Sequence, residues 1–223
     1  MNQKPFFETV WDYAKKYPVT SVIILLNLLM LLVTLFTGGF LNANLYRLGA
    51  LVPVSITGTP EFLRIISGMF LHGSIFHFLS NMFVLYILGT AIEKSLGPTR
   101  FFLLYMLSGI GSGLAVMYFS NSMTVGASGA IWGIIGALLI ITFVRPHWFT
   151  PRSVQSIRSL MILNLVITFL IPNVSIAGHI GGLVTGALLI LLLLPKKPYF
   201  LRNVREYYNG HEVVGDGDAE IVS

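Results

Sequence analysis

Six long apolar segments determine what this chain of 223 residues can fold into. A helix needs roughly 20 predominantly apolar residues to cross the hydrocarbon core of a bilayer, and five of the six segments come close to that length. The fifth is shorter and carries Asn164. Because backbone polar groups in lipid must be bonded internally, such segments cross as helices. The sequence therefore predicts an all-α polytopic membrane protein, a bundle of six transmembrane helices. The segments are 19–37, 71–92, 100–120, 125–144, 156–171 and 175–194.

The low content of charged residues excludes an ordinary soluble domain. Hydrophobic residues make up 55% of the chain and charged residues only 10%, whereas soluble domains carry about 25% charged residues. The chain has no cysteine, so it has neither disulfides nor thiol chemistry. The net charge of +5 would fit a nucleic-acid-binding protein, but the positions of the basic residues favour a different interpretation.

The basic residues predict how the chain is oriented in the membrane. If the N-terminus is cytoplasmic, twelve of the fourteen lysines and arginines fall on the cytoplasmic side, and only Arg47 and Arg64 do not. Cytoplasmic loops of membrane proteins carry such an excess. We therefore expect a multi-pass protein of the cell membrane with both termini in the cytoplasm, in contact with lipid and not with nucleic acid. The sequence carries no signal for an oligomeric state. The twelve residues are Lys4, Lys15, Lys16, Lys94, Arg100, Arg145, Arg152, Arg158, Lys196, Lys197, Arg202 and Arg205.

This arrangement divides the chain into three regions. We expect a cytoplasmic N-terminal segment over 1–18, a membrane domain over 19–194 and a cytoplasmic tail over 195–223 that is partly disordered. Between the first two spans, residues 38–70 contain glycines and prolines but also many leucines and valines. They are too apolar for a free linker, so we expect a structured outer loop. Within it, Arg64 is expected to bind backbone carbonyls or to pair with Glu61.

Four polar side chains from three spans share one depth in the outer half of the membrane. His77 and Asn81 belong to the second span, Ser128 to the fourth and His179 to the sixth. At 1.5 Å per residue from the outer end of each span, they lie roughly 5–15 Å deep. His77 and Asn81 are four residues apart and so share one helix face. Polar side chains inside a bilayer are costly, which makes these four candidate functional residues.

Glycines predict close contact between the fourth and sixth spans, because small residues let membrane helices approach each other. Such contact would bring Ser128 within hydrogen-bond reach of His179. A serine hydroxyl becomes a nucleophile when an adjacent base takes its proton, so Ser128 and His179 are a candidate nucleophile and base. Without the histidine, the glycines and the serine would indicate no more than a packing face. The glycines are Gly129 and Gly133 on the fourth span and Gly178, Gly182 and Gly186 on the sixth.

The acidic residues exclude a Ser-His-Asp triad, because none of the nine lies inside a span at the depth of His179. A Ser-His dyad is what remains. Trp132 lies four residues after Ser128, on the same helix face, and is expected to stack on His179 and orient it. Acyl transfer also needs donors for an oxyanion. The N–H of Ser128 at a helix start has no intrahelical partner, and His77 and Asn81 can add side-chain donors.

Other kinds of site and protein also place polar groups inside a membrane. A metal site of His72, His77 and His179 would lack any carboxylate or thiolate and matches no zinc spacing, so neither a metal nor another cofactor is expected. A transporter or proton channel would need polar residues through the full depth of the membrane. The inner halves of the second, fourth and sixth spans are nearly all apolar, as in residues 188–193.

Taken together, the motifs on three spans resemble those of the rhomboid family of intramembrane serine proteases. Residues 126–129 resemble the family's Gly-x-Ser-Gly nucleophile motif, and residues 179–182 with Gly186 resemble its catalytic-histidine segment. His72, His77 and Asn81 resemble its His-x4-His-x3-Asn pattern, and Arg64 matches the arginine of its Trp-Arg pair. The likeness extends from about residue 19 to 194 and is similar to the simple six-helix bacterial form.

The resemblance implies a serine endopeptidase that cleaves transmembrane helices of membrane-protein substrates, which enter sideways near the fifth span. It implies Ser128 as nucleophile, His179 as base, and His77, Asn81 and the Ser128 N–H at the oxyanion hole. Leu63 stands where the family usually has tryptophan, and residue 132 is tryptophan where tyrosine is frequent. A catalytically inactive relative that binds membrane helices or acts in quality control is the alternative. Such relatives usually lack the nucleophile or the base, and both are present here.

Overall fold

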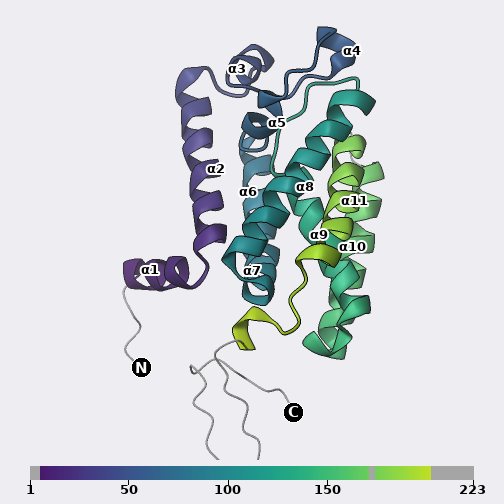
Figure 1. The fold of residues 1–223 in the computed structure, drawn as a ribbon. Coiled ribbons are helices and arrows are strands. Elements are labelled where there is room, and N and C mark those ends of the chain that lie inside the picture. The colour runs from purple at the N-terminus through teal and green to yellow at the C-terminus, as the bar shows by residue number, and fades with distance from the viewer. Residues whose placement is uncertain (1–5, 171–173, 202–223) are drawn as a thin grey trace, which may run out of the picture.

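The structure, a computed structural model, describes residues 6–170 and 174–201, and its regular elements there are helices. Figure 1 shows an upright bundle, with α1 at one end and α3 and α4 at the other. In the described part of the chain, the only strand-like pairing is an isolated bridge between Leu51 and Thr124. The predicted all-α class is therefore confirmed. The helices of the bundle are α1 (Phe6–Lys16), α2 (Pro18–Thr37), α6 (Ile75–Val84), α7 (Thr90–Leu96), α8 (Pro98–Phe119), α9 (Ser128–Val144), α10 (Pro151–Leu170) and α11 (Ile176–Leu193).

Short elements connect these helices. Three helices fill the segment between α2 and α6: α3 (Asn42–Arg47), α4 (Val54–Thr57) and α5 (Leu63–Gly68). A π-helical turn, Leu85–Gly89, joins α6 to α7 without a break, so that one continuous helix runs from Ile75 to Leu96. Turns of 3-10 helix lie at Pro146–Trp148 and Tyr199–Leu201.

The helices have the lengths and apolarity of a polytopic membrane protein. By length and composition, four of the described helices can cross a bilayer: Pro18–Thr37, Ile75–Leu96, Pro98–Phe119 and Ile176–Leu193. The helix α9 is equally apolar but has 17 residues, and α10 has 20 residues but a more polar first half. Each of the six predicted segments thus corresponds to a helix, while the count of six crossings stays a prediction.

Two predicted spans begin later than their apolar runs. The second was expected from residue 71, but α6 begins at Ile75 because Ser74 caps it, its Oγ accepting the N–H of His77 at 3.0 Å. The fourth was expected from residue 125, but α9 begins at Ser128, after Thr124 has paired with Leu51. The proline expected to end the fifth span, Pro172, lies outside the described residues.

The segment between α2 and α6 is structured, as predicted. Arg64 makes both of the interactions considered for it: its guanidinium donates to the carbonyl oxygens of Tyr46 (2.6 Å) and Ala50 (3.2 Å) and pairs with Glu61 at 2.8 Å. The guanidinium also lies over the ring of Tyr46, 4.1 Å from its centroid. Leu63, which stands where the family that the motifs resemble usually has tryptophan, is 87% exposed. The loop is therefore anchored through Arg64 and Tyr46 and not through residue 63.

The N-terminal segment contains a helix that was not predicted. The helix α1 lies across the end of α2 in Figure 1, and Tyr13 joins it to the second span. The hydroxyl of Tyr13 lies 2.7 Å from that of Thr90, and its ring stacks on Tyr86 at a centroid distance of 5.1 Å.

The described part of the C-terminal tail contacts the bundle, since Lys94 of α7 lies over the ring of Phe200. The disorder expected in the tail falls on residues outside the description.

A buried carboxylate fixes the start of α2. Glu93 of α7 is 2% exposed, and its two oxygens accept the N–H groups of Val19 and Thr20, each at 2.9 Å, and the hydroxyl of Thr20 at 2.6 Å. The first N–H groups of a helix have no intrahelical partner, and its N-terminus attracts negative charge. Glu93 therefore ties the first span to the end of the second.

The most extensive helix packing is that of α11 against α9 and α8. Glycines make this contact possible: a Cβ at Gly182 would collide with the carbonyl oxygen of Gly129, and one at Gly186 with that of Gly133. The same two α9 glycines also leave room for Ser112 and Ser108 of α8. The backbones of α9 and α11 are thus too close for a side chain between them at these positions, as the glycine pattern predicts.

Candidate active site

Ser128 is the first residue of α9, and the turn before it is fixed on both sides. Gly126 has φ +128°, a conformation that side chains rarely adopt, and its N–H donates to the carbonyl of Gly68 at 2.9 Å. A Cβ at this position would also lie 2.8 Å from the ring of His77. Glycine is therefore required at 126 for the conformation of the turn and for the close approach of His77.

His179 lies in the first turn of α11, which Ser175 caps by accepting the N–H of Gly178 at 3.2 Å. The close packing of α11 on α9 brings the imidazole of His179 to Ser128, with Nε2 3.0 Å from Ser128 Oγ. The hydrogen bond expected between these residues is therefore present. Both residues are partly accessible.

Trp132 lies over the imidazole of His179. The two rings are stacked, with their centroids 5.1 Å apart and their planes 29° apart, and Trp132 is 4% exposed. The expected stacking is thus observed. Because the indole of Trp132 is buried and packed in the bundle, it restricts the tilt of the imidazole, and it neither donates nor accepts a proton in doing so.

The other ring nitrogen of His179 has a partner that sequence reasoning missed. His179 Nδ1 lies 2.8 Å from Thr168 Oγ1, on α10. Thr168 belongs to the fifth apolar segment, close to the end at which that span approaches the outer face. The depth count that selected the other polar residues would have found it, had it been applied to the odd-numbered spans.

His77 and Asn81 take different positions relative to Ser128. His77 Nδ1 accepts the N–H of Gly73 at 3.4 Å, so in the neutral ring Nε2 carries the proton. That nitrogen faces the turn at Gly126, next to Ser128. Asn81 is 7% exposed and donates its amide to the carbonyl of His77 at 2.9 Å. One of its two amide hydrogens is thus used within α6.

His72 is a buried residue that packs against His77. It is 1% exposed, and its ring meets those of His77 and Phe78 edge-on, at centroid distances of 5.1 and 5.4 Å. These contacts are those of a packing residue. In the residues that the structure describes, no cluster of three or more His, Cys, Asp or Glu is arranged to hold a metal ion.

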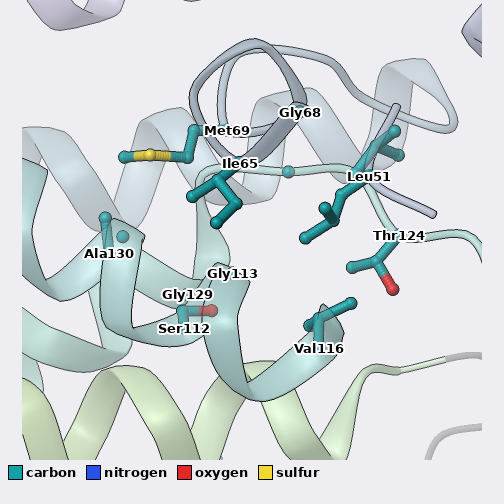
Figure 2. Close-up of a pocket in the computed structure, with 13 residues that line it drawn as sticks. Leu51, Ile65, Gly68, Met69, Ser112, Gly113, Val116, Thr124, Gly129 and Ala130 are labelled. Atoms are coloured by element: carbon teal, nitrogen blue, oxygen red, sulfur yellow. The ribbon is translucent and has the colours of Figure 1, made fainter. Parts of the chain in front are cut away.

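A cavity of about 30 Å³ adjoins the turn that carries Ser128 (Figure 2). Its walls come from the outer loop, from α5, α8 and α9, and from the segment before α9. Ser112 and Thr124 are the polar side chains among its lining residues, and the rest of the lining is apolar or glycine. The volume fits one or two small molecules the size of water and excludes a bulky side chain.

Sequence comparison places the chain among known proteins. A family model described as Rhomboid domain matches residues 59–196, which include every candidate residue discussed above. The chain belongs to the rhomboid family. The resemblance seen in its motifs is thereby confirmed.

Curated rhomboid relatives match most of the chain. It is 34% identical over 182 residues to the rhomboid protease GluP of Bacillus subtilis (strain 168), which covers 81% of this chain and 36% of GluP. It is 36% identical over 174 residues to RHOMBOID-like protein 6, mitochondrial, of Arabidopsis thaliana, covering 74% and 56% of the two chains. The putative rhomboid protease YdcA of Bacillus subtilis (strain 168) is 32% identical over 139 residues, covering 61% and 70%. The chain thus spans 36% and 56% of the length of the first two relatives.

Proposed function

We propose that this rhomboid protein is an intramembrane serine endopeptidase that cleaves transmembrane helices of membrane-protein substrates with a Ser128–His179 dyad. The observation that carries the proposal is the 3.0 Å distance between Ser128 Oγ and His179 Nε2. It is a hydrogen-bond distance, and it aligns a hydroxyl with a ring nitrogen that can take its proton. Relatives named as rhomboid proteases give the reaction class further support.

The reaction follows from this pair. Ser128 Oγ attacks the scissile carbonyl while His179 Nε2 takes the hydroxyl proton, and the imidazolium then returns that proton to the leaving amine. The resulting acyl-enzyme is hydrolysed by a water that His179 activates in the same way. The dyad has no carboxylate, so we assign the orientation of the imidazole to Trp132 and not to a third charged residue.

The oxyanion would be stabilised by donors around the serine turn. As the first residue of α9, Ser128 has an N–H with no intrahelical partner. His77 Nε2–H faces the same turn, and we assign it the second donor position. Asn81 would contribute the amide hydrogen that the carbonyl of His77 does not take. These donors would act in a site with little water, where their effect on the developing charge is large.

The location of the protein and the route of its substrate belong to the same proposal. We place the chain in the cell membrane with both termini in the cytoplasm, with the membrane domain at 19–194 between an N-terminal segment and a tail. Substrates would enter beside α10, whose described side chains are mostly exposed, among them Ile162 (58%), Val166 (47%) and Phe169 (59%). A helix with an apolar, uncovered surface beside the dyad is a suitable neighbour for a substrate helix.

A cleavage assay tests the function. The full chain, purified in detergent and reconstituted in vesicles, is incubated with a single-span helix substrate, and the products are read by mass. Wild type should give two fragments that share one cut inside or next to the helix. Ser128→Ala should reduce turnover by at least about 10³-fold, as loss of a catalytic serine does. Equal turnover by wild type and Ser128→Ala would remove Ser128 as nucleophile. Binding of the substrate without any cut by wild type would instead support an inactive, helix-binding relative.

A further inference from the structure

His179 is held between two hydroxyl groups that come from different helices. Its Nε2 lies 3.0 Å from Ser128 Oγ on α9, and its Nδ1 lies 2.8 Å from Thr168 Oγ1 on α10. Both distances are those of a hydrogen bond. Thr168 is 3% exposed, so its hydroxyl is shielded from water and directed at the imidazole.

In a neutral imidazole, one ring nitrogen carries a proton and donates a hydrogen bond, and the other has a lone pair and accepts one. A base that takes the proton of Ser128 must have its lone pair on Nε2, so Nδ1 must carry the hydrogen and requires an acceptor. A threonine hydroxyl has lone pairs and can serve as that acceptor. We propose that Thr168 is a positioning residue that holds His179 in the tautomer protonated on Nδ1, a role that depends on the protease function proposed above.

Other groups do not provide this acceptor in the described part of the chain. The buried carboxylate of Glu93 is bonded to the start of α2, and Glu61 is paired with Arg64. Trp132 stacks on the face of the imidazole, where it restrains tilt but accepts no hydrogen bond from the ring edge. The stacking and the Thr168 bond are therefore complementary: one fixes the plane of the ring and the other fixes its protonated nitrogen.

The position of Thr168 depends on how α10 packs. Among the described side chains of this helix, Thr168 is the only one that is fully buried. A second polar anchor lies toward the opposite end, where Arg158 donates to the hydroxyl and the carbonyl of Thr142, both at 3.2 Å, and lies over the ring of Phe143. The catalytic tautomer thus requires the outer end of α10 to be in contact with α11.

Two substitutions test the hydroxyl of Thr168 and the volume of its side chain separately. Thr168→Val keeps the β-branched volume and removes the acceptor, whereas Thr168→Ser keeps the acceptor and removes a methyl group. With the vesicle assay and helix substrate described above, Thr168→Val should lower kcat about 10- to 100-fold and leave KM unchanged. The loss should be smaller than the ~10⁴-fold found when the orienting carboxylate of a Ser-His-Asp triad is replaced by an amide, because the hydroxyl is neutral. Thr168→Ser should keep kcat close to that of wild type.

The kinetic outcomes decide the proposal. Wild-type kcat in Thr168→Val would overturn it, and so would a Thr168→Ser variant as slow as Thr168→Val, because packing and not the hydroxyl would then matter. Ser128→Ala run in parallel distinguishes this result from a failure of the protease assignment. If Ser128→Ala is inactive while Thr168→Val turns over like wild type, the protease function stands and only the role of Thr168 fails.

A spectroscopic measurement reads the tautomer without any turnover. The full chain with ¹⁵N-labelled histidine in detergent micelles gives ring-nitrogen signals for its five histidines, and His179→Asn identifies those of His179. Wild type and Thr168→Ser should show a protonated Nδ1 and an unprotonated Nε2. Thr168→Val should show a mixture of the two tautomers. A wild-type ring protonated on Nε2, or one unchanged by Thr168→Val, would overturn the proposal whether or not the protein cleaves a substrate.

Discussion

Gly182 of α11 lies directly against the backbone carbonyl of Gly129 of α9, so closely that a Cβ at 182 would collide with it. Ser128 immediately precedes Gly129 in α9, and His179 lies three residues before Gly182 in α11. The contact between the two glycines therefore sets the distance between Ser128 and His179.

Gly182→Ala should separate the two helices and weaken the dyad. The added methyl group has no space, so α11 must move away from α9, and overpacking of this kind typically costs about 1–3 kcal/mol. We expect a lower midpoint of thermal unfolding in detergent and a fall of about tenfold or more in kcat, because a misplaced base loses general-base catalysis worth ~10²–10⁴-fold.

A matched control enlarges a side chain on the other face of the same helix. Val184 is 50% exposed, so Val184→Leu adds a carbon without meeting α9 and should leave both the unfolding midpoint and turnover unchanged. An active, fully stable Gly182→Ala protein would show that the close helix contact does not control the site.

Replacing Glu93 should destabilise the bundle at the end opposite the outer loop. Its carboxylate accepts two backbone N–H groups at the start of α2 and the hydroxyl of Thr20. Glu93→Ala leaves these donors unpaired in a buried place, at a cost of about 1–3 kcal/mol. Glu93→Gln keeps one carbonyl acceptor and should fall between wild type and Glu93→Ala. The midpoints of thermal unfolding in detergent give the order of stability of the three proteins, and equal midpoints would contradict the capping role.

The sequence predicts much of the bundle because the lipid leaves few alternatives. The apolar runs could cross only as helices, and the glycines at 129, 133, 182 and 186 predict which two helices touch. The contact of Ser128 with His179 and the stacking of Trp132 follow from that geometry. These predictions depend on helical periodicity, which is regular along the chain.

Features set by local capping or by loop packing could not be predicted in the same way. The apolar run alone does not show where α6 begins, because the start of the helix is set by the hydroxyl of Ser74, which caps it. The amide of Asn81 bonds to the carbonyl of His77 within its own helix, a choice that helical periodicity does not reveal. The depth count could have selected Thr168 as a polar residue at the right depth, but its contact with His179 also required knowing that α10 packs beside α11. The helix α1 was missed because its pattern is short and mixes Glu8 and Asp12 with lysines.

The orientation in the membrane can be measured because the chain contains no cysteine. Single cysteines are introduced at Ser122, in the connection before α9, and at Ser153, near the start of α10. With twelve of fourteen basic residues predicted to be cytoplasmic, an impermeant thiol reagent added to intact cells should label the cysteine at 122 and not the one at 153. Both should react after the cells are opened. Labelling of 153 and protection of 122 in intact cells would reverse the orientation.

The central claim is that His179 makes Ser128 a nucleophile. A fluorophosphonate probe reacts covalently with an activated serine, and peptide mapping by mass spectrometry identifies the residue that carries the adduct. In the purified full-length protein, the adduct should lie on Ser128 and be absent from Ser128→Ala. His179→Asn should slow labelling by about 10²-fold or more, because general-base assistance is worth ~10²–10⁴-fold. An adduct on another serine with Ser128 unmodified, or labelling of His179→Asn at the wild-type rate, would contradict the dyad.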